Sequence, residues 1–355
     1  MSDPRAGWVA VAALLAPVAV VHAEDTASLR FESGADYDTN ATREESGGPA
    51  DGVLRMVSEL RGSTPWGSGA RLSAGWHGGG KLHMDARGED VIHQKADLSV
   101  QQSLGRGVVL GWDAGARDRT SRAPVQSMDH TRLHTGPGLE TRLGALRLGA
   151  RGLFDRTNFK PDADLDADAL GGHLSASWLA ETWSVQGSGM LTRRTFTGPP
   201  TLVVGHDGSG VPVTDLGQGR HRLDEFRRLA LETQYGGDFL LSGEAAWERN
   251  DSNSLGGSLT RATLRCQATT PLPYALVLTA GVTLQRLDYD DPQFISETQL
   301  IEDEGRSALA LRLERPVSAQ WAIVAHGSTW FSPAASEGRY LRTVTGVGLS
   351  YLLEP

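Results

Sequence analysis

Apolar and polar residues alternate along most of the chain. In one segment Ile92, Ala96 and Leu98 occupy one set of alternate positions, while Lys95 and Asp97 occupy the other. A period of two residues is that of a β-strand whose faces meet different surroundings, and it is not the period of a helix. The pattern predicts sixteen strands, at residues 27–40, 52–62, 70–78, 91–104, 108–119, 131–143, 146–156, 168–179, 182–194, 223–235, 239–250, 259–270, 275–288, 306–315, 319–330 and 339–353.

The connections between these strands alternate in length. Short ones follow the even-numbered strands, as at 105–107, 144–145 and 236–238, although the first of them, 63–69, is longer. Long polar ones follow the odd-numbered strands, at residues 41–51, 79–90, 120–130, 157–167, 195–222, 251–258, 289–305 and 331–338. An outer-membrane barrel has short periplasmic turns and long extracellular loops, whereas a soluble β-sandwich has no reason to place its long loops at one end. The predicted fold class is an all-β, transmembrane, antiparallel up-and-down β-barrel of about sixteen strands.

The aromatic residues support a barrel in lipid. On this topology one group falls near the periplasmic end: Trp66, Trp178, Trp183, Tyr235, Phe239, Tyr274, Trp321 and Tyr351. A second group falls near the extracellular end: Tyr37, Trp76, Phe154, Trp247 and Trp330. Two aromatic girdles with aliphatic residues between them are typical of a lipid-facing band, and Trp112, in the middle of a strand, is an exception. The alternative is a soluble β-protein that uses its aromatic residues as core.

Residues 1–23 have the features of a secretory signal peptide. Arg5 precedes an apolar stretch at 8–21, and Val21-His22-Ala23 offers small residues where a signal peptidase reads. An N-terminal membrane anchor is the alternative. The remaining residues, 24–355, are expected to form the barrel, and they contain no apolar run of 18 residues that would predict a transmembrane helix. We therefore expect the protein in the outer membrane of a Gram-negative bacterium, in contact with lipid and lipopolysaccharide.

Composition excludes several other classes of function. The chain has 355 residues and a formal net charge of -9, so it lacks the basic background of a nucleic-acid binder. Its one cysteine, Cys266, cannot form an internal disulfide or a cysteine zinc site, and it is expected on the lipid face as a small apolar residue. No phosphate loop, metalloprotease helix or nucleotide fingerprint is present, so no cofactor or metal is expected.

The C-terminal strand carries Gly346-x-x-Leu349-x-Tyr351-x-Leu353. This is similar to the signal that the outer-membrane assembly machinery recognises, although the chain ends Leu-Leu-Glu-Pro instead of in an aromatic residue. Over nearly its whole length after residue 23 the chain resembles bacterial outer-membrane β-barrels. Residues 29–40 look like the first strand of barrels tied to exopolysaccharide secretion and of surface-lipoprotein assembly modifiers. The resemblance implies polysaccharide secretion with separate periplasmic partners, because the helical-repeat periplasmic domain of some of those families is missing.

The predicted polar faces carry many charges. The candidates for lining a pore are Arg61, Arg71, Arg117, Arg132, Arg142, Arg147, Arg151, Arg228, Arg265, Arg312, Arg342, Glu140, Glu232 and Glu244. One interpretation is a positively biased wall that favours anions, and the other is a network of ion pairs that braces the barrel. The alternatives to polysaccharide secretion are a general or anion-preferring diffusion porin and a closed structural barrel. Loop 195–222, rich in Gly and Pro, is expected to be irregular and long enough to fold inward and narrow the pore.

Two further patterns, an acidic run and a His-x-Ser pair, each have a simpler explanation than a functional site. The run from Asp162 to Asp168 has an acid at every second position, a spacing that could supply oxygen ligands to calcium. It departs from an EF-hand, so a solvated acidic loop is expected instead of a calcium site. The same is expected of Asp288, Asp290 and Asp291. His326 and Ser328 share a strand face, which faintly resembles the arrangement in outer-membrane phospholipase. The residues that follow differ from that family, so no enzyme activity is expected.

Overall fold

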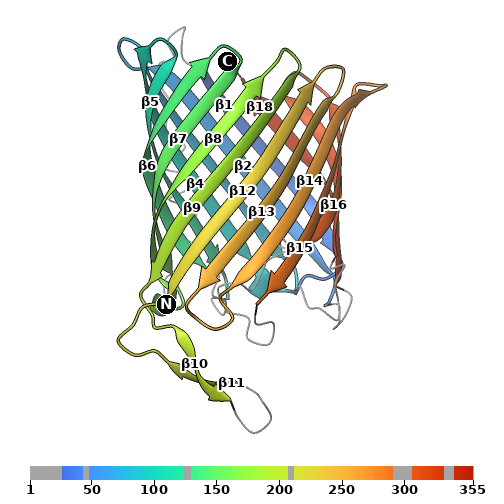
Figure 1. The fold of residues 1–355 in the computed structure, drawn as a ribbon. Helices are drawn as coiled ribbons and strands as arrows, with labels where there is room; N and C mark the ends of the chain where they lie inside the picture. The colour runs from blue at the N-terminus through green and yellow to red at the C-terminus, as the bar shows by residue number, and fades with distance from the viewer. Residues whose placement is uncertain are drawn as a thin grey trace.

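The computed structural model describes residues 26–42, 48–123, 129–206, 212–290, 306–331 and 340–354, so the predicted signal peptide lies outside the described residues. Sixteen strands form one closed barrel (Figure 1). They are β1 (Thr26–Asp38), β2 (Asp51–Pro65), β3 (Ala70–His83), β4 (Val91–Gly105), β5 (Val108–Ser121), β6 (His130–Leu143), β7 (Leu146–Phe159), β8 (Ala167–Leu179), β9 (Trp183–Phe196), β12 (Leu223–Gly236), β13 (Leu240–Ser252), β14 (Leu259–Leu272), β15 (Leu276–Tyr289), β16 (Ser307–Pro316), β17 (Trp321–Phe331) and β18 (Leu341–Leu353).

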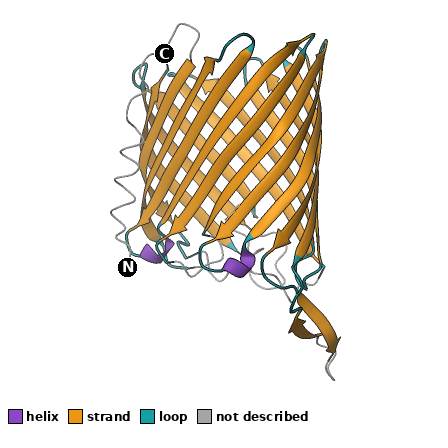
Figure 2. Cartoon of the chain, turned by 90° about the vertical axis from the view of Figure 1, so that its left-hand side faces the viewer, coloured by secondary structure: helices purple, strands orange, loops and turns teal. Residues whose placement is uncertain are grey.

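Each strand of the barrel pairs antiparallel with its neighbours in the chain. The barrel closes where β1 pairs with β18, with Leu29 opposite Leu353 and Asp38 opposite Val344. The strands are strongly tilted (Figures 1 and 2), and most have 13 to 15 residues, more than the roughly 9 to 11 that a tilted strand needs to cross a bilayer. Closure pairs the backbone groups of every strand, as hydrocarbon requires. Within the described ranges no helix has the length and apolar character needed to cross a membrane.

The two faces of the barrel wall have opposite character. The outer face carries exposed leucines such as Leu170 and Leu174, which are 69% and 66% exposed. The inner face carries polar residues that are buried against the neighbouring wall, among them Glu32, Asp36 and Asp38 of β1. The apolar face therefore points outward to lipid and the polar face points to the lumen, which is why the mean hydropathy of the chain is low, at -0.29.

Aromatic side chains gather at the end of the barrel with the short turns. Trp183 of β9 contacts Tyr235 of β12 with ring centroids 5.0 Å apart, and Trp321 of β17 contacts Tyr351 of β18 at 4.9 Å. These pairs lie on the outer face, as the girdle interpretation expects. Trp330 faces inward, because it lies opposite Arg342 on the polar face of β18. It therefore does not belong to the second girdle.

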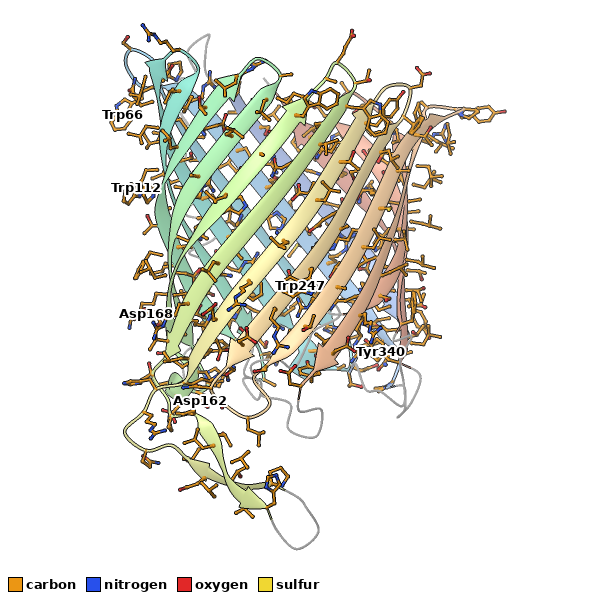
Figure 3. All side chains as sticks on the ribbon, viewed as in Figure 1. Trp66, Trp112, Asp162, Asp168, Trp247 and Tyr340 are labelled. Carbon is orange, nitrogen blue, oxygen red and sulfur yellow. The ribbon has the colours of Figure 1, made fainter. Side chains whose placement is uncertain are left out.

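The two ends of the barrel differ as the connection lengths indicate. At one end, turns such as Gly105-Arg106-Gly107 are so tight that all three residues have positive φ, which glycine adopts without strain. At the other end lie the long connections, including the short 3-10 helices η1 (Arg87–Glu89) and η2 (Ala163–Leu165). In Figure 3 Trp66 lies at the first end and Asp162 at the second. The end with the long connections is the extracellular one in this class of barrel.

The prediction for loop 195–222 is wrong. Its described part forms a two-stranded hairpin of β10 (Thr201–His206) and β11 (Pro212–Leu216), and this hairpin projects away from the extracellular rim (Figures 1 and 2). Leu202 pairs with Asp215 and Val203 with Thr214, and the register shifts between Val203 and Gly205. The short run of β-forming residues from Leu202 to Val204 explains why the segment is regular despite its Gly and Pro content. The described part of this loop therefore does not narrow the lumen.

Candidate functional site: the inner wall of the barrel

The candidate residues for lining a pore all occupy inward-facing strand positions. They alternate with outward apolar residues and share the face that carries Glu32 and Asp36. Side chains from strands that are not neighbours meet on this face: Arg312 of β16 reaches Glu32 of β1, although β17 and β18 lie between them. Only the concave side of a closed wall brings such strands together. Whether these residues line a conducting pore stays a prediction.

The densest ionic cluster lies on the wall from β16 to β2. Glu32 accepts hydrogen bonds from Arg55 of β2 at 2.8 Å and from Arg312 at 2.8 and 3.2 Å. Arg312 also donates to Glu314 of its own strand at 3.0 Å, and Arg55 donates to Asp36 at 3.2 Å. One buried carboxylate therefore links β1 and its neighbour β2 to β16, a strand that pairs with neither of them.

The same wall carries two further contacts across the closing strands. Arg342 of β18 donates from Nε to both carboxylate oxygens of Asp38 at 3.0 Å, and both side chains are almost fully buried. The Arg342 guanidinium also lies 5.5 Å from the ring centroid of Trp330. His326 of β17 has Nε2 3.4 Å from Asp36 Oδ1. Charges in this region are compensated pair by pair, as buried charges require.

A second cluster joins β12, β13 and β14. Glu244 of β13 accepts from Arg228 of β12 and from Arg265 of β14, the latter at 3.1 Å. Glu248, four residues along the same strand, lies 3.2 Å from Arg228 and 3.4 Å from Arg261. Acids on the middle strand thus alternate with arginines on both flanking strands, which is the favourable cross-strand arrangement of opposite charges.

The arginines of β6 and β7 are also mostly paired. Arg147 Nε lies 3.1 Å from Glu140 Oε1, and Arg151 Nη2 lies 2.9 Å from Asp113 Oδ2 of β5. Asp155 of β7 pairs with Arg132. These side chains are roughly half exposed to the lumen, so each pair is worth less than a buried one. The bracing network foreseen as one interpretation of the wall is therefore present at these positions.

A few candidates stand apart from the network. Arg61 pairs with Glu59 of its own strand and is 73% exposed, and Arg71 donates to Ser63 at 2.8 Å. Within the described ranges no acid lies within ion-pair distance of Arg117 or Arg142, and no base lies within that distance of Glu232. Arg117 and Arg142 are therefore, with Arg71, the arginines of the predicted set that have no acid partner in the described ranges.

Near the periplasmic mouth the wall forms a polar hollow. Its volume is about 220 Å³, and β6, β7, β8, β9 and β12 contribute to it. Hydroxyl and amide groups dominate the lining: Ser175, Ser177, Ser184, Gln186 and Gln234 lie beside Glu140, Arg147 and Glu232. Such groups both donate and accept hydrogen bonds, so the hollow matches solutes that are rich in hydroxyl groups.

Sequence reasoning missed the acids of β1 and their partner Arg55. Glu32, Asp36 and Asp38 alternate with Phe31, Ala35 and Tyr37, which is the period that identified the other lumen residues. The same rule applied to residues 27–40 finds them. Their partners could not be found in this way, because Glu32 and Arg312 are 280 positions apart in the chain.

The two other sequence patterns have structural roles in the described residues. Asp162 caps η2 by accepting from Asp164 N at 3.0 Å, and Asp166 accepts from Phe159 N at 2.6 Å. Asp168 instead points outward, 4.0 Å from Arg156 (Figure 3 labels Asp162 and Asp168). These acids do not converge, and the described ranges contain no group of three potential ligands that could hold a metal.

Asp288 and Asp290 pair with Arg286 and Arg249, and Asp291 lies outside the described residues. His326 and Ser328 face the lumen, but both ring nitrogens of His326 lie near Arg55 and Asp36 instead of Ser328. The described structure contains no hydrogen bond between His326 and Ser328. Cys266 is exposed on the outer face of β14, as expected of a small apolar residue in lipid.

The closed barrel, its apolar outer surface and its charged lumen define an outer-membrane β-barrel protein. No protein-family model matches the sequence, and no curated protein matches it. Solved structures do match, among them the outer-membrane expressed OmpT of Vibrio cholerae, with 9% identity, a TM-score of 0.50 and coverage of 94% of this chain and 99% of that one.

An anion-selective porin from Comamonas acidovorans is similar at 13% identity and a TM-score of 0.48, over 93% of this chain and 100% of the porin. A bacterial polysaccharide outer membrane secretin is similar at 10% identity and a TM-score of 0.45, over 94% of this chain and 100% of the secretin. Identities this low reflect a shared fold and carry nothing about substrate.

Proposed function

We propose that the protein is a passive channel through the outer membrane, and more specifically a conduit for secretion of a polysaccharide that periplasmic partners deliver. The observation that supports it is the charged and polar inner wall of a sixteen-stranded barrel. A barrel of this size leaves an aqueous lumen unless loops plug it, and charged side chains on the wall are stable only when water or counter-charges reach them. The hairpin of loop 195–222 points away from that lumen.

Two features favour a saccharide over a small ion. Most wall arginines are compensated by acids, so the wall attracts neither anions nor cations strongly. The hollow lined by Ser177, Gln186 and Gln234 near the periplasmic mouth offers hydrogen-bonding groups where a delivered chain would enter. The likeness of residues 29–40 to the first strand of secretion barrels supports periplasmic partners, and the C-terminal pattern supports delivery to the membrane by the assembly machinery.

Single-channel recording tests the proposal. Neutral dextran oligomers added at the periplasmic mouth are expected to interrupt the ion current, and the interruptions are expected to shorten in the Ser177→Ala/Gln186→Leu variant. Ser73→Ala in β3 is the matched control, because Ser73 lies on the inner wall outside this hollow. Ion current without any interruption by dextran would contradict the saccharide, and absence of current would favour a closed structural barrel.

An anion-preferring diffusion porin is the second candidate. It is favoured by Arg117 and Arg142, whose charges no described acid compensates. A porin of this kind is expected to conduct chloride in preference to potassium at low salt and to show no dextran interruptions. We propose no catalytic step, because His326 faces Arg55 and Asp36 and is not positioned to activate Ser328.

A further inference from the structure

The outer face of the barrel carries a row of arginines on one half of its circumference. On each of these strands, going along the outer face towards the extracellular end, the last apolar residue is followed two positions on by an arginine. The pairs of apolar residue and arginine are Phe154 and Arg156 on β7, Leu191 and Arg193 on β9, Leu229 and Arg227 on β12, Trp247 and Arg249 on β13, and Leu284 and Arg286 on β15. These guanidinium groups therefore mark the edge of the hydrocarbon.

An acid follows the arginine, one outward position further from the membrane, on three of these strands. Arg227 Nε donates to Glu225 at 2.8 Å, Arg249 Nε donates to Asp251 at 2.7 Å, and Arg286 Nε donates to Asp288 at 2.9 Å. The acids are on the extracellular side in every case. Glu225 holds Arg227 by one edge, and Asp288 holds Arg286 in the same way, so each is oriented before any ligand arrives. Arg249 differs, because its two terminal nitrogens already donate to Asp290, both at 2.7 Å.

Three of the arginines form a cluster on adjacent strands. Arg227 of β12 lies directly opposite Arg249 of β13 in the sheet register, and Arg193 of β9 lies opposite Glu225, two residues from Arg227. Like charges that face each other across a strand pair are unfavourable. Asp251 offsets part of this repulsion, because it accepts from Arg249 and lies 3.9 Å from Arg227. Arg193 is exposed, and no acid in the described ranges lies within ion-pair distance of it.

The other half of the circumference lacks this row. On β16, β17, β18, β1, β2, β3 and β4, the described outward residues of the extracellular half are uncharged; they include Leu309, Thr329, Thr343, Tyr37, Leu54, Leu82, Ile92 and Gln94. Charge at the membrane edge is therefore a property of one side and not a general consequence of where the bilayer ends.

We infer that the outer face of β9, β12 and β13 is a binding site for the phosphate groups of an outer-leaflet glycolipid. Arginine binds phosphate through two parallel hydrogen bonds, and the groups placed to do so here are Arg193, which has no ion-pair partner in the described ranges, and Arg227 on the neighbouring strand. Leu191, Leu229 and Trp247 directly below supply an apolar surface for the acyl chains of the same molecule. A ligand with phosphate above and hydrocarbon below fits both halves of this surface.

The test is lipid binding to the full-length protein, purified in detergent and freed of bound lipid. Native mass spectrometry with purified lipopolysaccharide is expected to show a defined adduct. The Arg193→Gln/Arg227→Gln variant is expected to raise the dissociation constant about tenfold or more, because charge-assisted contacts to phosphate are lost. The matched control is Arg117→Gln/Arg142→Gln, which removes two charges from the inner wall.

Three outcomes would overturn the inference. They are unchanged affinity in the outer-face variant, an equal loss in the inner-wall control, and equal binding of dephosphorylated lipopolysaccharide. Inorganic phosphate alone is expected to compete only weakly; if it displaces the glycolipid at comparable concentration, the site is one for free phosphate and the lipid assignment fails. Heat-modifiable migration identical to that of the unmodified protein shows that each variant is folded.

Discussion

Arg342 on β18 and Asp38 on β1 join the last strand of the barrel to the first. Nε of Arg342 donates to both carboxylate oxygens at 3.0 Å, and both side chains are almost fully buried. A buried pair is costly to break because the remaining charge has neither water nor a partner. The contact therefore makes closure of the barrel depend on one ion pair as well as on the backbone ladder between β1 and β18.

Arg342→Gln is expected to lower the free energy of unfolding by about 3 to 5 kcal/mol, since it leaves Asp38 buried and unpaired. Arg61→Gln is the control: that side chain is 73% exposed, so the expected loss is about 1 kcal/mol or less. Urea titration in lipid vesicles measures both. Equal losses in the two variants would show that the Arg342 contact contributes no more than a surface pair.

Replacing Arg117 and Arg142 by Gln is expected to move the selectivity of the open channel towards cations with little change in melting temperature, because these arginines have no described acid partner. Replacing Arg147 and Arg151 is expected to move selectivity further and also to lower the melting temperature, since Glu140 and Asp113 lose their partners. Reversal potentials and melting curves measured together separate the two effects. A channel whose selectivity changes in neither variant would show that these side chains lie away from the narrow part.

Surface labelling tests the orientation of the barrel. In a Cys266→Ala background, cysteines at Thr42, Asp164 and Val204 are expected to react with an impermeant thiol reagent on intact cells, because they lie at the end with the long connections. Ser209, in the same loop as Val204, is expected to react too and lies outside the described residues. Cysteines at Arg106 and Gly237 are expected to react only after the outer membrane is opened. The opposite labelling pattern would invert the topology.

Asp290, just beyond β15, makes the extracellular end sensitive to acid. Two hydrogen bonds from Arg249, both of 2.7 Å, hold the pKa of Asp290 below its ordinary value of 3.8. A lowered pKa in the folded state contributes stability above about 3.8 that is lost as the pH falls through the lowered value. Hydrogen exchange of the Asp290 amide, which donates to Ser258 O at 3.1 Å, is expected to lose protection in that range. In the Asp290→Asn variant this amide is expected to exchange faster at neutral pH, and its exchange is expected not to change further when the pH is lowered. If exchange in the variant still responds to acid, another group causes the response.

A methyl group at Gly136 of β6 has no space. A Cβ atom there would lie 1.9 Å from the carbonyl oxygen of Gly152 on β7, next to Pro137, which cannot donate to the ladder. Gly136→Ala is expected to destabilise the barrel by about 1 to 3 kcal/mol, because the strands must separate. Gly187→Ala is the control, since nothing lies within 4 Å of its Cβ position. The urea concentrations at the unfolding midpoints of the two variants measure the difference. Equal midpoints would show that Gly136 has room for a methyl group.

The strands were predictable because lipid outside and water inside impose a period of two on every one of them. The strand predicted at 91–104 is β4, Val91–Gly105, in the structure, and many of the others agree within one or two residues. Most differences lie at the extracellular ends, where strands such as β3 continue further than predicted, to His83. Hydropathy does not show that extension, because Gly78-Gly-Gly80 interrupts the alternation before Lys81, Leu82 and His83 resume it. The hairpin of β10 and β11 is not predictable from composition, because the Gly and Pro residues around Leu202 and Val213 are as typical of an irregular loop.

The ion pairs of the wall were not predictable, although the side chains that form them were. Alternation places Arg312 and Arg151 on the inner face, but it does not say how far each strand is shifted along its neighbour. Glu32 meets Arg312 only after the whole sheet has curved and closed, over 280 positions of chain. Partner choice is thus a property of the closed barrel and not of any segment within it.

The pairs across β16, β18, β1 and β2 have a consequence for assembly. Sliding β18 along β1 by two residues would leave every apolar side chain in lipid and every polar one in water, so the membrane alone cannot distinguish that barrel from the native one. It would, however, carry Arg342 away from Asp38 and break the alignment that brings Arg312 to Glu32. Hydrophobic alternation specifies only which way a side chain points. The ion pairs between the first and last strands are what favour one alignment of β1 with β18 over the shifted ones.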